Sequence, residues 1–431
     1  MKHTLIKKEL TNGTRILFVN VPGSSSYYFN TICNGGLNYA LKSKYELPHL
    51  LEHLAFEGTE NYPKPGQMGY ELEKIGGWYN AWTSEETIRY YLVGSIGDYQ
   101  TLSDIALEQY TRPLFKQKSI DEQKQVVERE LKRDIDDDGA RIRSLTYSTL
   151  FPSKACFAKD RVATISNISR KDILDFYKTT HTQANTIFVV AGDLSSDRRS
   201  NITKSIEKAI ENLPIGKKLH KIHELSPDFG LKIQTLPSKL EGQLYFSLGF
   251  IKNTYESEIK YRAACSVASA IFNRGDGSRI FRKSRSTGLA YTVNSGISNN
   301  FDYSELYVID KTDPHLASKL FELCLSELKD ITEENFTNEE LNRAKGYMAG
   351  SYDTDYETSR ALADWYGPKF VDCEELYSPV DFAKTIRKVT RDDIKSVLDS
   401  FVVNGDWIVS IVGKDSEKYK PMFKEIMEKY F

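Results

Sequence analysis

The 431-residue sequence contains few cysteines and few histidines. Its five cysteines are far apart, and none belongs to a C-x-x-C pair: Cys33, Cys156, Cys265, Cys324 and Cys373. A disulfide framework or a cysteine-ligated zinc site is therefore not expected, and a reducing cytoplasm is the simplest setting. Because there are only seven histidines, a pair of them at ligand spacing stands out from chance.

The sequence also lacks an excess of charge of either sign and a long apolar run. Lys and Arg number 58 against 60 Asp and Glu, so the chain has no global field with which to hold nucleic acid or an anionic membrane. No apolar run approaches the roughly 20 residues that span a bilayer, and residues 1–9 lack the apolar core of a signal peptide. We therefore expect a cytoplasmic protein that binds neither nucleic acid nor membranes.

An internal repeat is the main sign of organisation. Residues 164–172 match residues 385–393 at an offset of 221, and each copy has a Ser or Thr N-cap with Asp three positions later. A short helix and an apolar strand follow, and the strands end at Gly192 and Gly413, at the same offset. Two elements in register over about 30 residues indicate duplicated halves.

The composition places a linker between these halves. Residues 216–229 are rich in basic residues, carry glycine and proline, and lack a periodic pattern. We expect a first domain over residues 1–215 and a second over residues 230–431. Helix-length amphipathic segments do not alternate regularly with the strand-like runs, which predicts an α+β fold rather than a doubly wound sheet. The strand-like runs are residues 14–19, 186–191, 243–250, 305–309 and 407–412.

Residues 47–59 carry the clearest chemical signal. The segment has proline near its start and glycine near its end, as a helix prefers. His49 and His53 are four residues apart, so both rings lie on one face of that helix and can bind one ion. Glu52 lies close enough to reach a water molecule on the ion. This H-x-x-E-H pattern is the inverted form of the H-E-x-x-H zinc site.

A third, acidic ligand is expected on the helix predicted for residues 119–133. Ser119 and Glu122 predict a capping box at its start. Glu130 lies at the edge of the buried apolar stripe, whereas Glu128 is about 200° round the helix from it, among charged residues. Both cannot face one ion, so Glu130 is the better ligand and Glu128 is interpreted as a solvated charge.

These residues resemble the inverzincin zinc metallopeptidases, the family of pitrilysin, insulin-degrading enzyme and mitochondrial processing peptidase. In that family a glutamate ligand follows H-x-x-E-H after about 76 residues, and 76 residues separate His53 from Glu130. Phe56–Thr59 is similar to the family's F-x-G-T, and Gly76–Thr83 to its G-G-x-x-N-A-x-T. The resemblance covers essentially the whole chain.

The resemblance implies two homologous α/β-sandwich halves of about 210 residues, with one Zn²⁺ per chain, bound in the first half. It implies a metalloendopeptidase that hydrolyses unfolded peptides or oligopeptides, with Glu52 as the base. The peptide substrate would lie as an added strand along residues 78–83, contacted by Asn80, Ala81 and Thr83. Without the resemblance, Asn80 could equally be a turn residue.

Two segments depart from the family pattern. Ser278–Tyr291 resembles S-R-L-F-x-x-L-R-x-x-x-G-L-A-Y, which implies that Arg285 and Tyr291 stabilise the oxyanion, but the segment is one residue shorter. Its basic residues could instead form a solvated face or a small anion-binding patch. Gln123 stands where the family has a second glutamate, so zinc affinity or activity would be reduced if that position supports the metal.

The short members of the family pair as dimers around a closed chamber. The resemblance therefore implies a homodimer, with a heterodimer as the alternative. Some relatives have lost the zinc motif and serve as partner or scaffold subunits, which gives the second hypothesis for function: a weak or inactive subunit of a peptidase-like complex.

Overall fold

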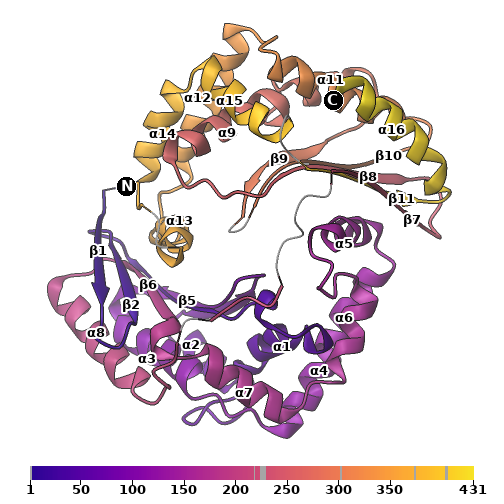
Figure 1. Cartoon of the computed structure of the whole chain (residues 1–431). Helices are drawn as coiled ribbons and strands as arrows, with labels where there is room; N and C mark the ends of the chain where they lie inside the picture. Colours follow the sequence, from indigo (N-terminus) through magenta and orange to yellow (C-terminus); the bar gives the residue numbers. More distant parts are fainter. Residues whose placement is uncertain (1, 218, 224–229, 301–302, 373–374, 403–405) are drawn as a thin grey trace.

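The computed structural model describes residues 2–217, 219–223, 230–300, 303–372, 375–402 and 406–431. Two halves with the same layered design make up the molecule (Figure 1). In each half one sheet faces the interior, and helices cover its outer side. Each half has its own large buried apolar cluster. The predicted α+β fold with two homologous halves is confirmed.

The first half contains a six-stranded sheet. Its strands are β1 (Thr4–Glu9), β2 (Arg15–Asn20), β3 (Ser26–Asn34), β4 (Trp78–Thr83), β5 (Thr87–Ser95) and β6 (Thr186–Gly192). They are ordered β1-β2-β6-β3-β5-β4, so β4 lies at an edge. Only β2 and β6 pair in parallel. Every residue of β6 is buried, because layers pack on both faces of the sheet.

The second half repeats this sheet with five strands. They are β7 (Leu231–Pro237), β8 (Leu244–Lys252), β9 (Asn294–Asn299), β10 (Ser304–Thr312) and β11 (Asp406–Gly413). Their order, β7-β11-β8-β10-β9, matches β2-β6-β3-β5-β4 strand for strand, and the pair β7–β11 is again parallel. The five strand-like runs predicted from the sequence lie in β2, β6, β8, β10 and β11.

The helices extend the repeat. The first half has α1 (Leu47–Leu54), α2 (Gln67–Glu73), α3 (Tyr99–Thr111), α4 (Gln117–Ile135), α5 (Asp138–Leu150), α6 (Ala158–Ile165), α7 (Arg170–Thr180) and α8 (Ser196–Ile210). The second half has α9 (Ile259–Asn273), α10 (Arg279–Ser286), α11 (Ala317–Thr332), α12 (Asn338–Thr354), α13 (Ser359–Val371), α14 (Pro379–Lys388), α15 (Arg391–Val402) and α16 (Tyr419–Tyr430). The first residues of α5 and α13 are 221 positions apart, and so are their last residues, which is the offset of the repeat.

The helix caps predicted in the two copies of the repeat are present, whereas the capping box predicted at the start of α4 is absent. Ser169 and Asp172 bond reciprocally at the start of α7, and Thr390 and Asp393 do the same before α15. The capping box predicted at Ser119 is wrong, because α4 begins two residues earlier and has no side-chain cap. A hydrogen bond of 2.8 Å between the side chains of residues 117 and 121, one turn apart, supports this extra length.

The two halves exchange a helix. Helix α5 lies between β5 and β6 of the first sheet in sequence but packs on the second sheet, and α13 of the second half packs on the first sheet (Figure 1). Ile142 and Leu145 of α5 form a buried cluster with Val412 of β11. The hydroxyls of Thr146 and Ser410 hydrogen-bond at 2.9 Å beside it. Each sheet therefore has its inner face covered by a helix of the other half.

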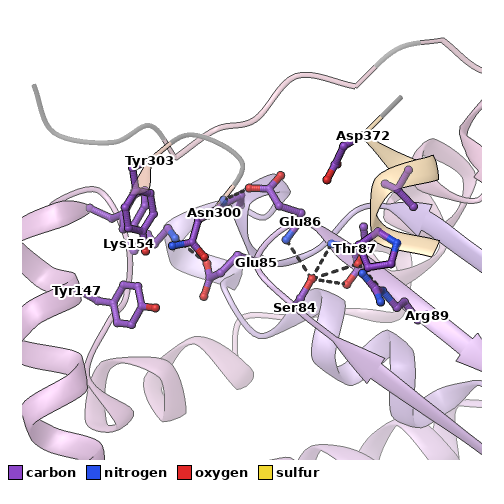
Figure 2. A pocket seen from close by; sticks show the side chains of 14 residues that line it. Ser84, Glu85, Glu86, Thr87, Arg89, Tyr147, Lys154, Asn300, Tyr303 and Asp372 are labelled. Atoms are coloured by element: carbon purple, nitrogen blue, oxygen red, sulfur yellow. Dashed lines mark hydrogen bonds and ion pairs between the residues drawn. The ribbon is translucent and has the colours of Figure 1, made fainter. Parts of the chain in front are cut away.

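A cavity of about 260 Å³ lies where the halves meet (Figure 2). Two acidic side chains on its wall, Glu85 and Glu86, are paired with lysines. The Lys154 ammonium lies 2.6 Å from a carboxylate oxygen of Glu85, and Lys221 lies 3.0 Å from Glu86. The described lining holds three acidic and two basic side chains, most of them from the first half.

Part of the predicted linker, residues 216–229, belongs to the described residues. Residues 218 and 224–229 lie outside the described residues. His223, within the predicted linker, is buried, and its Nε2 lies 2.9 Å from the carbonyl oxygen of Ala40. This part of the linker therefore packs against the first half. No described helix combines the length and apolar character needed to cross a bilayer.

Candidate metal site

Helix α1 buries one face and presents two histidines on the other. The buried residues are Leu47, Pro48, Leu50, Leu51 and Leu54. Through them α1 packs against α4, α7 and β4. These contacts fix the rotation of the helix, so that His49 and His53 project toward α4.

The structure brings the three predicted metal ligands together. The Nε2 atoms of His49 and His53 lie 3.2 Å apart, and Oε2 of Glu130 lies 3.7 Å and 3.6 Å from them. Ligand atoms about 2.0–2.2 Å from a tetrahedral zinc ion lie about 3.3–3.6 Å from one another. The donor set and its spacing therefore fit zinc. Within the described part of the chain, no other three His, Cys, Asp or Glu residues converge in this way.

Glu128, the alternative on α4, belongs to a different face. Its carboxylate lies 2.5 Å from the ammonium of Lys132, one turn later on the same helix. It contributes no ligand atom to the group formed with His49 and His53. The helical spacing that favoured Glu130 over Glu128 agrees with this placement.

A buried carboxylate orients the ring of His49. Nδ1 of His49 donates to Oε2 of Glu46 over 3.0 Å, since a carboxylate can only accept, and Nε2 is left for a metal. Nε of Arg161 donates to the other Glu46 oxygen over 2.5 Å. Burial alone would raise the pKa of Glu46, but His49 and Arg161 outweigh it and lower the pKa. Burial would likewise lower the pKa of His49, and Glu46 raises it instead.

A second chain of hydrogen bonds orients the ring of His53. The amide nitrogen of Gln123 donates to the Glu57 carboxylate over 2.7 Å, which fixes the orientation of that amide. Its oxygen then faces Nδ1 of His53 at 3.1 Å and accepts from it. Nε2 of His53 is therefore directed at the metal position. Gln123 thus supports the ligand without a charge of its own.

Glu52, the predicted base, is half-buried on the same helix. Burial raises the pKa of Tyr90 well above its usual value, and the charges of Cys33 and Glu52 add to the rise. Within the described residues no group hydrogen-bonds this carboxylate, which leaves both of its oxygens available to a water molecule.

The predicted substrate residues lie on the edge strand β4. This strand packs against α1, so its residues lie beside the metal ligands. Asn80 is exposed, and its Oδ1 accepts from the backbone N–H of Ala81 over 2.9 Å. The buried Thr83 hydroxyl has no hydrogen-bond partner among the described residues. The Asn80 side chain thus occupies one backbone N–H group of the edge strand β4.

Arg285 and Tyr291 lie in the second half, on α10 and just beyond it. The Arg285 guanidinium lies 4.5 Å from the centre of the Tyr291 ring, and Tyr291 is 75% exposed. Helix α10 packs against α9 and α11, and within the described chain neither side chain contacts the metal ligands. Arg279, in the same segment, is buried and pairs with Glu340 at 2.7 Å. It is therefore not part of a solvated basic face.

The sequence did not reveal three supporting residues. Glu46 could have been found, since an acidic residue three positions before a helical histidine can reach its ring. Arg161 and Glu57 carry no such local signal, because each reaches the site only through the tertiary fold.

Two family models match the chain. One, described as "Insulinase (Peptidase family M16)", matches residues 33–153, and the other, "Peptidase M16 inactive domain", matches residues 167–348. The chain belongs to peptidase family M16. The insulinase model matches the region that contains His49, His53 and Glu130. In the described second half of this M16 chain, no comparable group of metal ligands is found.

Similar proteins span nearly all of this M16 chain. A protein of Rickettsia felis named "Uncharacterized zinc protease" is 26% identical, over 91% of this chain and 94% of its own. The mitochondrial-processing peptidase subunit beta of Saccharomyces cerevisiae is 21% identical, over 90% of this chain and 86% of its own length. A solved structure of a protease from Helicobacter pylori has a TM-score of 0.84 at 18% identity. The match covers 95% of this chain and 100% of that protease chain. The last likeness shows the shared fold.

Replacing Glu130 should remove the metal, whereas replacing its neighbour should not. We expect Glu130→Ala to weaken zinc binding by more than about 100-fold, since even indirect support of a ligand is worth ten- to hundredfold. Glu128→Ala removes the same side chain from the solvent-facing side of α4 and should bind zinc like wild type. Competition with a chromogenic chelator measures both. Equal affinities in the two variants would contradict the ligand assignment.

Replacing Glu46 tests the support of His49. Glu46→Gln keeps the shape but loses the charge that orients the imidazole, and we expect zinc affinity to fall about ten- to hundredfold. Glu85→Gln removes a carboxylate that pairs with Lys154 away from the metal ligands and serves as the control. Circular dichroism verifies that both variants fold. A folded Glu46→Gln variant with wild-type zinc affinity would rule out this role.

Proposed function

We propose that this chain is a zinc metalloendopeptidase that hydrolyses unfolded peptides or oligopeptides. The convergence of His49, His53 and Glu130, with Glu52 on the same helix face, carries the proposal. The names of the zinc-protease relatives support the same chemistry. Two imidazoles and one carboxylate leave a coordination position open, as catalytic zinc sites require.

The side chains around the site have separate tasks. A bound zinc ion would polarise the scissile carbonyl and lower the pKa of a water molecule. Glu52 takes the proton of the water and later delivers it to the leaving amine. Glu46 and Gln123 hold the two imidazoles so that each keeps a bare nitrogen at the metal. The buried face of α1 keeps this arrangement rigid.

The substrate is proposed to add a strand to β4. The open edge of the sheet offers backbone groups at the regular spacing of an extended peptide. Asn80 would exchange its bond to its own backbone for one to the peptide. Trp78 and Trp82 flank it on the exposed side of the strand, 43% and 65% exposed, and offer apolar contact to substrate side chains. Only an unfolded segment can pair in this way.

We further propose a homodimer in which each copy supplies Arg285 and Tyr291 to the other copy's site, where they stabilise the oxyanion. The exposure of Tyr291 and its separation from the metal ligands within one chain support this arrangement. The yeast relative is itself named as a subunit. We also propose a cytoplasmic location, and the four described cysteines are free thiols, as a reducing compartment would leave them.

Replacing the base should abolish hydrolysis and leave the metal in place. We expect Glu52→Gln to slow cleavage of a quenched fluorescent peptide by about 10²–10⁴-fold, the usual contribution of general base catalysis. Zinc content, measured on the same samples, should stay at one ion per chain, since Glu52 is not a ligand.

The same experiment distinguishes the second hypothesis. If zinc-loaded wild type cleaves the peptide no faster than Glu52→Gln, the peptidase proposal fails. The chain would then be an inactive partner or scaffold subunit. Glu128→Ala serves as the control for a carboxylate lost near the site, and it should cleave at the wild-type rate.

Mixing two inactive variants should restore activity if the site is shared between copies. We expect Glu52→Gln and Tyr291→Ala each to be inactive or strongly impaired. After unfolding and refolding together, half of the dimers are mixed, and each mixed dimer has one complete site. About a quarter of all sites is then intact. Sedimentation velocity establishes that dimers form. No recovery in a dimeric mixture would show that Tyr291 does not act across copies.

A further inference from the structure

The edge strand β4 carries two exposed tryptophans on one face of its sheet. Trp78 lies opposite Val93 of β5, and Val93 packs against the apolar cluster formed with α13. Trp82 lies four residues further along β4 and therefore on the same face. Tyr79 and Ala81, between them, pack in the cluster that contains α1. Both tryptophans thus lie on the face that α13 covers, opposite to the face of the metal helix.

The second half holds Trp78 in place. The Arg360 guanidinium of α13 lies 5.1 Å from the centre of the Trp78 ring and 5.2 Å from that of Tyr91. Nε of Arg360 lies 3.4 Å from the Asp364 carboxylate, which also accepts from the Tyr28 hydroxyl over 2.9 Å. A guanidinium held in this way favours one orientation of the indole by cation–π attraction. The rest of the Trp78 surface stays open as a rigid aromatic platform.

Trp82 is open on both sides of its ring. Among the described residues, no aromatic ring or cation stacks on it, and it is the more exposed of the two tryptophans. Exposed apolar residues are common when they are scattered singly. Two indoles on the same face of one open strand, which packs against the helix that carries the histidine ligands, instead form a repeated contact surface.

The backbone of β4 determines which residues of an added peptide meet the indoles. The backbone N–H of Ser84 donates to the Thr87 oxygen of β5 over 2.8 Å. This direction alternates along a strand, so the backbone groups of Trp78 and Trp82 also point to β5. Those between them point to the open edge, where the N–H of Ala81 meets a side-chain oxygen. An antiparallel peptide therefore faces each indole in a non-hydrogen-bonded pair, with Cα atoms about 4.5 Å apart and side chains at their closest.

We propose that Trp78 and Trp82 select peptides with two aromatic residues four positions apart. The inference rests on the proposed addition of the substrate to β4. Both strands rise by about 3.4 Å per residue, so the side chains that meet the two indoles are also four residues apart. Residues three positions apart point to opposite faces, and only one of them reaches an indole. Aromatic side chains are favoured because each aromatic pair gains about two- to tenfold in affinity beyond its buried area.

Fluorescence anisotropy of labelled peptides tests the spacing. The zinc-loaded full chain carries Glu52→Gln, so that bound peptide is not cut. Two peptides of equal length and composition contain two phenylalanines, four positions apart in the first and three positions apart in the second. We expect the first to bind about two- to tenfold more tightly, the value of one aromatic pair. Equal affinities, or no binding of either peptide up to about 1 mM, would overturn the proposal.

Replacing Trp78 in the same chain should abolish the preference. We expect Trp78→Ala to bind both peptides with the affinity of the parent chain for the second peptide, since Trp82 meets one phenylalanine in either case. This retained affinity also shows that the variant folds. Tyr347→Ala removes a similarly exposed aromatic side chain from α12 and should keep the preference. A Trp78→Ala variant that still prefers the first peptide would contradict the assignment.

Arg360 acts through Trp78 and is a positioning residue. Arg360→Lys keeps a cation beside the ring and should retain more of the preference than Arg360→Met. Equal loss in both variants would rule out a role for this charge. Sedimentation velocity of Trp78→Ala tests the other occupant of this face, a second copy of the chain. Loss of dimers with unchanged peptide affinities would make the face an interface between copies and overturn the proposal.

The binding measurement is separate from the test of hydrolysis. A chain that cleaves peptides but binds both spacings equally contradicts the selection by Trp78 and Trp82 and leaves the peptidase proposal intact. A chain that prefers the first peptide but cleaves nothing supports the selection and contradicts the peptidase proposal.

Discussion

The packing of α1 against α4 is the constraint on which the metal site depends. Three ligand atoms from two helices far apart in the sequence meet within 3.7 Å only because apolar side chains fix the rotation of α1. A turn by one residue position, about 100°, would carry both histidines away from Glu130. The hydrogen bonds behind each imidazole then decide which ring nitrogen stays bare. Apolar packing therefore sets the position of each ligand, and the hydrogen bonds set which imidazole nitrogen is free to bind the metal.

Local geometry made the three ligands predictable, and distant contacts made their support unpredictable. The four-residue spacing of His49 and His53 and the helical period around Glu130 need no knowledge of the fold. Arg161 lies over a hundred residues from His49, and no pattern in the sequence connects them. The role of Gln123 was open for the same reason, since it depends on the amide orientation that Glu57 imposes. The roles of Arg285 and Tyr291 stay a prediction, because within the described chain neither side chain contacts the metal ligands.

The fold shows the same division. The repeat predicted two similar halves and their helix caps, since capping involves residues three positions apart. It did not reveal the start of α4, where a bond between residues 117 and 121 adds helix beyond the expected Ser119 cap. Nor did it reveal that α5 and α13 change places, because an apolar helix face would fit either sheet equally well. Only the lengths and directions of the connecting segments decide between the two.

This exchange of helices has a consequence for each half of the molecule. A single half on its own would leave the inner face of its sheet bare and its α5-like helix without a surface to cover. Two copies of such a half could satisfy each other by trading that helix across a twofold axis. The two halves of this chain are therefore arranged like a symmetric pair of short chains that trade one helix. Among the described residues, only the first of them carries the three metal ligands.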